Sequence, residues 1–372
     1  MKMLQLEECC EILDSMRVPI TAKDRKKGPY PYYGANGVQD YVADYIFDDD
    51  LVLLAEDGGN FGSDKRPIAY KVSGKCWVNN HAHVLKPKAG MNVDYLCYSL
   101  MFYKVDGMVN GATRMKLTQA AMRRMLIPSR TIEGQKAIVK LLNRIQMLIK
   151  VEKEQLKKYD ELIKSRFVEM FGDPENNPMQ WEKSPLSERL NVLGGYAFKS
   201  DLFNENVGIP VLRIGNINAG YFRPINMVFW DEDESLARYL MYPGDLVISL
   251  TGTVGKDDYA NVCILGSEYE KYYLNQRNAK LELKHGLNKY FLSQLLKFES
   301  IKKRLTGISR GVRQANVSNK DISNLMVPIP PIDLQEKFAT FIQDINKSKF
   351  ATQKALTETQ QLFDSLMQKY FG

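Results

Sequence analysis

Long donor side chains and side-chain amides gather in segments of this chain that glycine and proline mark as loops. Arginine and lysine pair with phosphate oxygens or guanine edges, whereas asparagine and glutamine pair with adenine. Glycine lets backbone N–H groups approach a phosphate closely. This combination predicts contacts with nucleic acid rather than bond-breaking chemistry. In the first third of the chain the candidates are Asn36, Asn60, Lys65, Arg66, Asn79, Asn80, Arg114 and Lys116.

The second half of the chain repeats this mixture of residues. The segment 309–314 (SRGVRQ) is the strongest candidate, because it places three long donor side chains on one loop. For any single residue the alternative is an ordinary polar turn, and the sequence leaves that alternative open. The candidates here are Arg213, Asn216, Asn218, Thr251, Lys256, Gln276, Arg277, Arg310, Arg313 and Gln314.

Other chemistries fit the sequence poorly. His81 and His83 have no cysteine or carboxylate at metal-ligand spacing, and Gly255-Lys256 lacks the remainder of a nucleotide-binding P-loop. The glycine loop 57–62 is followed by a strand rather than by the helix that an adenosylmethionine loop requires, and no N-P-P-Y/F segment is present. Asp245 with Glu282 and Lys284 only loosely resembles a nuclease triad. We therefore predict no catalytic, cofactor-binding or metal-binding residue.

Two long helices must stand behind these loops. From Gln135 to Phe171 apolar residues recur at steps of three and four, which predicts one amphipathic helix. About 37 residues at about 1.5 Å each make a rod of about 55 Å, whose apolar stripe needs a second long helix as cover. A stripe from Phe338 to Phe371 provides it. The first helix leads into the second globular domain, so a second helix that pairs with it must return antiparallel, as a coiled coil.

The two halves match at a constant offset of 200 residues. Any two amphipathic helices can be aligned through the periodicity of their apolar residues, but this match starts before the helices. It predicts an internal duplication. Matched pairs are Gly111 and Gly311, Pro128 and Pro328, Gln135 and Gln335, Leu156 and Leu356, and Phe171 and Phe371.

Composition sets the outer limits. A length of 372 residues favours two domains, and a net charge of +7 is too modest to indicate nucleic acid by itself. No apolar run approaches the roughly 18 residues of a membrane span, so no membrane partner is predicted. Five scattered cysteines without CxxC spacing suit a reducing cytoplasm.

Three short features recur in the same order in both halves. A glycine lies beside an asparagine early in each half, a D-L-V-L/I strand precedes a glycine loop, and I-x-x-Q opens each long helix. In that order they are Gly34-Ala35-Asn36 and Gly215-Asn216, Asp50–Leu53 and Asp245–Ile248, and Ile132–Gln135 and Ile332–Gln335. Taken over essentially the whole chain, this arrangement resembles the specificity subunit of type I restriction–modification systems.

The resemblance implies a mixed α/β (α+β) fold with two target recognition domains related by a pseudo-twofold axis and separated by two antiparallel coiled-coil helices. Each domain would read half of a bipartite site in double-stranded DNA. The expected segments are domain 1 (1–133), spacer helix 1 (134–172), domain 2 (173–332) and spacer helix 2 (333–372).

The resemblance also implies partners. Two modification (methyltransferase) subunits would carry adenosylmethionine, and restriction (translocase/nuclease) subunits would carry ATP and Mg. This chain would then be non-catalytic, without a cofactor of its own. Two alternatives remain: a coiled-coil scaffold with two protein-binding domains, and a fused DNA methyltransferase or nuclease.

Overall fold

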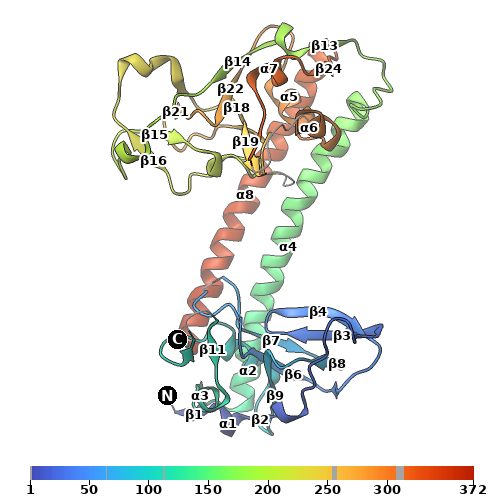
Figure 1. Cartoon of the computed structure of the whole chain (residues 1–372), viewed down its shortest axis with the longest axis vertical. Helices are drawn as coiled ribbons and strands as arrows, with labels where there is room; N and C mark the ends of the chain where they lie inside the picture. The colour runs from blue at the N-terminus through green and yellow to red at the C-terminus, as the bar shows by residue number, and fades with distance from the viewer. Residues whose placement is uncertain (1, 64, 112–113, 254–257, 307–313) are drawn as a thin grey trace. The chain divides into compact units, whose positions relative to one another are not determined.

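The computed structural model describes all residues except 1, 64, 112–113, 254–257 and 307–313. The chain forms two compact units (Figure 1). Unit 1 comprises Met1–Glu154 together with Gln353–Gly372, and unit 2 comprises Gln155–Thr352. Each unit therefore contains one sheet-rich domain and part of both long helices. Among the described residues, no helix is both long and apolar enough to cross a membrane.

Unit 1 is built on two four-stranded sheets. The first has the order β2-β9-β6-β7 and the second the order β4-β3-β8-β5. Two further pairs, β1-β12 and β10-β11, are short. The strands are β1 (Met3–Gln5), β2 (Cys10–Ile12), β3 (Lys27–Gly34), β4 (Gly37–Val42), β5 (Phe47–Asp48), β6 (Leu51–Ala55), β7 (Ala69–Val72), β8 (Lys75–Val78), β9 (Ala82–Pro87), β10 (Val109–Asn110), β11 (Lys116–Leu117) and β12 (Leu126–Pro128), and the helices are α1 (Leu6–Cys9), α2 (Val93–Met101) and α3 (Gln119–Arg123).

Unit 2 has the same plan. Its four-stranded sheets have the orders β14-β22-β18-β20 and β16-β15-β21-β17, and its short pairs are β13-β24 and β19-β23. Both four-stranded sheets and the pair β13-β24 repeat the strand order of unit 1, so the predicted duplication is confirmed. The pair β19-β23 differs from β10-β11, and its counterpart in unit 1 is the single bridge between Asp57 and Lys116. The elements are β13 (Lys183–Pro185), β14 (Leu190–Gly194), β15 (Ile209–Leu212), β16 (Val228–Trp230), β17 (Leu240–Met241), β18 (Leu246–Ser249), β19 (Thr251–Thr253), β20 (Val262–Ile264), β21 (Tyr272–Leu274), β22 (Asn278–Leu283), β23 (Gln314–Asn316), β24 (Met326–Pro328), α5 (Lys289–Leu295), α6 (Glu299–Thr306) and α7 (Asn319–Ser323).

The predicted long helices are α4 (Ile132–Phe171) and α8 (Ile332–Phe371), each of 40 residues. In unit 2 the Asp160 carboxylate of α4 meets Lys349 of α8, and further along α4 the ring of Phe167 lies 5.5 Å from that of Phe338. As the residue number increases along α4, the residue number of its contact on α8 decreases, so the two helices run antiparallel.

Unit 1 has the same antiparallel arrangement. Arg130, just before α4, lies over the ring of Tyr370 near the end of α8, whereas Glu152 accepts a hydrogen bond from Thr359. The predicted fold class is confirmed. The pseudo-twofold axis concerns the placement of one unit relative to the other and stays a prediction.

The glutamine of each I-x-x-Q motif joins its long helix to the domain beside it. Gln135 is buried; its Oε1 accepts the N–H of Asn92, the N-cap of α2, at 2.8 Å, and its Nε2 donates to the carbonyls of Gly90 and Arg130. In unit 2, Gln335 makes the equivalent bonds to Asn288 N–H, Gly286 and Pro330. We call this arrangement the glutamine clamp. Its three bonds fix the entry of the helix.

Candidate nucleic-acid interface

Each unit contains a parallel strand pair that brings loops to one edge. β3 runs parallel to β8 in unit 1, and β15 runs parallel to β21 in unit 2. The carboxyl ends of parallel strands meet at the same edge of a sheet. Asn36 therefore follows β3 beside Asn79 and Asn80, which follow β8, whereas Arg213 follows β15 beside the turn that carries Gln276 and Arg277. We call these the carboxyl edges of units 1 and 2.

The carboxyl edge of unit 1 joins residues that are far apart in sequence. The Asn36 side-chain amide donates to the carbonyl of Gly58, in the glycine loop after β6, at 3.0 Å. Arg114 Nη2 lies 2.7 Å from Asp57 Oδ1, and Lys116 Nζ lies 2.9 Å from Glu56 Oε1. The Arg114 and Lys116 side chains are 58% and 51% exposed. Three predicted contact residues thus meet at one exposed edge.

A buried charge network supports this edge, and sequence reasoning missed it. His83 Nδ1 lies 2.6 Å from Asp14 Oδ2 and 3.7 Å from Glu56, and its Nε2 lies 2.9 Å from the Leu117 carbonyl. One ligand atom from each of Asp14, Glu56 and His83 lies within 4.8 Å of the others. No carboxylate stands at ligand spacing from these histidines in the sequence, but folding brings carboxylates to them from distant segments.

The network also has its own cations. Arg17 Nη1 lies 2.6 Å from Glu56 and its Nη2 lies 3.5 Å from Asp14. Burial acts to raise the pKa of Asp14, but hydrogen bonds, first that from His83, outweigh it and leave the pKa below its usual value. The pKa of Glu56 is lowered in the same way, with burial offset by hydrogen bonds from Arg17 and Lys116. Both carboxylates are thus kept charged by protein donors and hold the edge in place.

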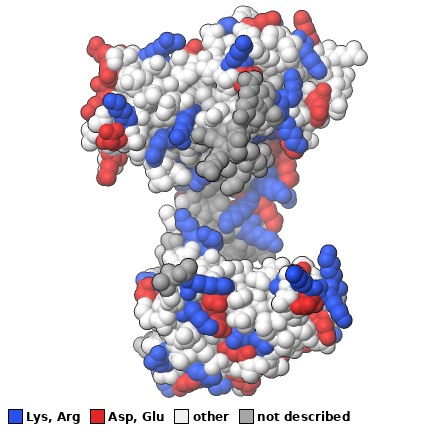
Figure 2. Space-filling view, in the orientation of Figure 1, with Lys and Arg blue, Asp and Glu red and all other residues white. Residues whose placement is uncertain are grey.

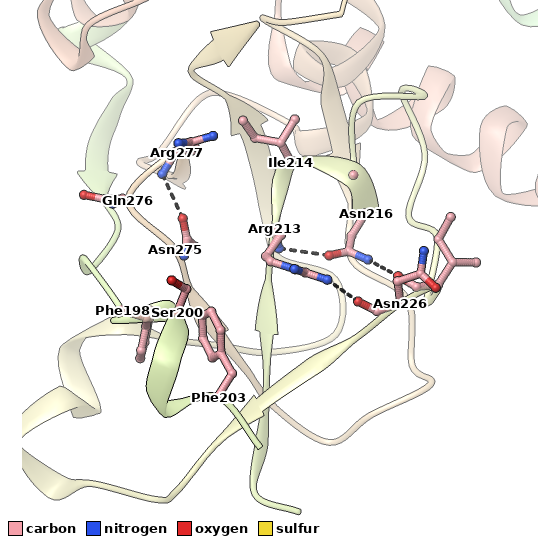
Figure 3. Close-up of a pocket in the computed structure, with 12 residues that line it drawn as sticks. Phe198, Ser200, Phe203, Arg213, Ile214, Asn216, Asn226, Asn275, Gln276 and Arg277 are labelled. Atoms are coloured by element: carbon pink, nitrogen blue, oxygen red, sulfur yellow. Dashed lines mark hydrogen bonds between the residues drawn. The ribbon is translucent and has the colours of Figure 1, made fainter. Parts of the chain in front are cut away.

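The carboxyl edge of unit 2 surrounds a pocket of about 530 Å³ (Figure 3). Arg213 donates through its guanidinium to the carbonyl of Asn226, and the backbone N–H of Arg277 donates to Asn275 Oδ1 at 3.3 Å. The pocket combines apolar rings with amides and two guanidinium groups. Its lining residues are Phe198, Ser200, Phe203, Arg213, Ile214, Gly215, Asn216, Ile225, Asn226, Asn275, Gln276 and Arg277.

Two predicted contact residues have structural roles instead. Asn79 is 3% exposed; it donates to Gln39 Oε1 and accepts the N–H of His81. Asn216 is 2% exposed and uses its amide on the backbone of Arg213, Arg223 and Ile225. Their amides shape the turns at the two edges, so they do not present free groups to a ligand.

The remaining candidates are less informative. Lys65, Arg66 and Asn80 are exposed, as are Gln276 and Arg277. Asn60 donates a long hydrogen bond of 3.4 Å to Pro67, and Asn218 accepts from Asn261 through its carbonyl. Thr251 lies on β19, with its hydroxyl buried and unpaired among the described residues. Lys256, Arg310 and Arg313 lie outside the described residues, and Gln314 is described only through its backbone in β23.

The charged side chains on the surface do not identify a binding site by themselves. Lysine, arginine, aspartate and glutamate are interspersed over the visible face of each unit (Figure 2), so charge alone marks no single interface there.

The five cysteines are buried and form no disulfide. Burial raises the thiol pKa to about 11 for Cys9 and Cys76 and to about 12 for Cys10, Cys97 and Cys263. Such thiols stay protonated at neutral pH and are poor nucleophiles.

The fold and the two edges define a class of protein: a duplicated scaffold that carries two loop-built binding edges. A family model described as the type I restriction modification DNA specificity domain matches residues 1–159 and again 178–360. The chain belongs to this family, and it is a specificity subunit with two target recognition domains. The scaffold and fused-enzyme alternatives are not favoured.

Known proteins are similar over nearly the full length. A putative type I restriction enzyme specificity subunit of Haemophilus influenzae, S.HindORF215P, is 26% identical over 347 residues, which cover 91% of this chain and 85% of the relative. The crystal structure of the type I system S subunit from M. genitalium is similar with a TM-score of 0.62 at 14% identity, over 100% of this chain and 96% of that one. A chain from a study of complex assembly and conformational transition in the type I R-M system is similar with a TM-score of 0.53, also at 14% identity, over 100% of this chain and 97% of that one.

Proposed function

We propose that this chain is the non-catalytic subunit that reads a bipartite DNA sequence, with one half-site for each carboxyl edge. The presence of two such edges on one repeated scaffold carries the proposal. In unit 1 Asn36 and Asn80 follow the ends of the parallel strand pair, and Arg114 and Lys116 join them through their ion pairs with Asp57 and Glu56. In unit 2 Arg213, Gln276 and Arg277 follow the ends of the corresponding pair. Two separate readers connected by continuous helices suit a site whose central base pairs are not read.

The long helices provide a surface for partner subunits. On α4, Met147, Leu148 and Val151 are 59%, 53% and 48% exposed although they are apolar. Exposed apolar side chains that lie close together are typical of protein interfaces. We propose that two modification subunits dock on the helices, that they supply adenosylmethionine, and that restriction subunits supply ATP and Mg. The proposed location is the cytoplasm, where the DNA is.

Adenine methylation in the host genome tests this function. Deletion of the gene for this chain should remove methylation from one bipartite motif and leave other motifs methylated. In an electrophoretic mobility-shift assay at moderate salt, the purified complex should bind a duplex that contains that motif more tightly than a duplex in which both half-sites are scrambled. A methylation pattern that does not change on deletion would contradict the proposal.

A further inference from the structure

We propose that Arg114 reads a guanine in the half-site recognised by unit 1, and that Asp57 is the positioning residue that fixes its guanidinium group. The inference rests on the proposed function, because it requires that unit 1 binds DNA. It adds to the proposed function the identity of one recognised base, guanine, and a role for the Asp57 carboxylate at a surface that binds DNA.

The first observation is the layering of the pair. Asp57 Oδ1 lies 2.7 Å from Arg114 Nη2, with the Asp57 side chain 19% exposed and that of Arg114 58% exposed. The carboxylate therefore lies beneath and the guanidinium outside. Gly58 has a φ of +60°, and a Cβ there would lie 3.0 Å from Nη2 and 3.1 Å from Nε of Arg114. Glycine suits this position, because other side chains are strained at this φ and their Cβ would press on the guanidinium that lies against the backbone.

The second observation is the rigidity of the frame around Asp57. The N–H of Glu56 donates to the His81 carbonyl at 2.9 Å, and the N–H of Leu117 donates to the Glu56 carbonyl at 2.7 Å. His81 Nδ1 lies 2.7 Å from the same Asp57 oxygen that binds Arg114. Three chain segments thus hold the carboxylate, which holds the guanidinium. A side chain fixed before binding loses less conformational entropy when it makes its contact.

The third point is the choice between a base and a phosphate. The Asp57 carboxylate offsets the charge of Arg114 and would repel a phosphate at close range, so the pair is a weak phosphate ligand. Neutral acceptors are not repelled in this way. Guanine presents two of them, O6 and N7, in the geometry that an arginine fork matches. Adenine presents an amino donor in place of O6, which conflicts with a group that only donates.

The remaining donors suit this contact. A guanidinium has five N–H groups, and Nη2 uses one on Asp57. Among the residues that the structure describes, the Nη1 and Nε groups of Arg114 have no acceptor. Four N–H groups are therefore left after the Asp57 contact. The second N–H of Nη2, an atom that also lies 3.5 Å from His81 Nδ1, forms with the neighbouring N–H of Nη1 or Nε the paired edge that a bidentate contact with one guanine requires.

Three variants of the full chain, each in complex with its modification subunits, test the inference. Arg114→Lys keeps the charge but loses the fork. Arg114→Ala combined with Asp57→Asn removes the pair without a change in net charge. The matched control is Arg123→Ala combined with Glu7→Gln, which removes another partly exposed ion pair of unit 1, 3.3 Å long. The readout is competition binding to a panel of duplexes in which each base pair of the half-site is replaced in turn, at several salt concentrations.

We expect the wild-type complex to discriminate by about 5- to 150-fold against replacement of one G·C pair. Arg114→Lys and the charge-neutral double variant should lose the discrimination at that G·C pair. Both should keep the discrimination at every other base pair and the salt dependence of binding. The control should behave as wild type. Discrimination that persists in both variants would overturn the inference alone, as would an equal loss on all duplexes. A wild-type complex that binds all duplexes equally would overturn the proposed function as well.

Discussion

The two carboxyl edges differ in whether their cationic side chains are paired with carboxylates. In unit 1 the two cations that meet at the edge are paired with acids, Arg114 with Asp57 and Lys116 with Glu56. In unit 2 neither Arg213 nor Arg277 has a carboxylate partner among the described residues, and the edge is instead a pocket walled in part by Phe198 and Phe203. One edge is a set of fixed ion pairs and the other is a cavity with unneutralised guanidinium groups.

The frame beneath the edges shows no such difference. Strand order, the parallel strand pair and the glutamine clamp occur in both units. Positions that fix the frame are satisfied by hydrogen bonds within the protein, whereas positions at the edge face solvent and are free to change. A duplicated protein can therefore keep one architecture and acquire two different binding surfaces.

The largest expected effect concerns the shared clamp. Gln135→Leu and Gln335→Leu should each reduce the free energy of unfolding by about 1–3 kcal/mol, because a buried N–H and two carbonyls lose their partners. Similar losses for the two variants would confirm that the clamps are equivalent. The measurement is urea unfolding followed by circular dichroism, with Gln155→Leu on the exposed face of α4 as control. A loss at one clamp only would contradict a common frame.

A smaller effect should separate the two edges. Arg277→Ala should weaken binding to all sequences and lower the slope of log affinity against log salt by about one, because an unneutralised arginine suits a phosphate contact. The charge-neutral change at Asp57 and Arg114 should leave that slope unaltered. Lys153→Ala, an exposed substitution on α4, is the control. An unchanged slope for Arg277→Ala would remove the proposed electrostatic contrast between the units.

Much of the frame could be predicted from the sequence because it is periodic and repeated. The apolar stripes gave both long helices, and the constant offset gave the duplication. The edges were harder because they depend on contacts distant in sequence. Asn79 and Asn216 are of residue types expected at DNA contacts, but both are buried. Asp57 stands out in the sequence only as part of the glycine loop 57–62, and no local pattern indicates its contact with Arg114. His83 meets Asp14 across 69 residues, with no local pattern to indicate it.

The central claim is that each unit reads its own half-site, and exchange of one domain tests it most directly. Replacement of Met1–Ser129 by the corresponding domain of a relative should change one half of the methylated motif and leave the other half unchanged, because each edge is built within its own unit. The measurement is the methylated-adenine map of cells that express the exchanged chain with the same modification subunits. A map in which both halves change together, or in which neither changes, would contradict two independent readers.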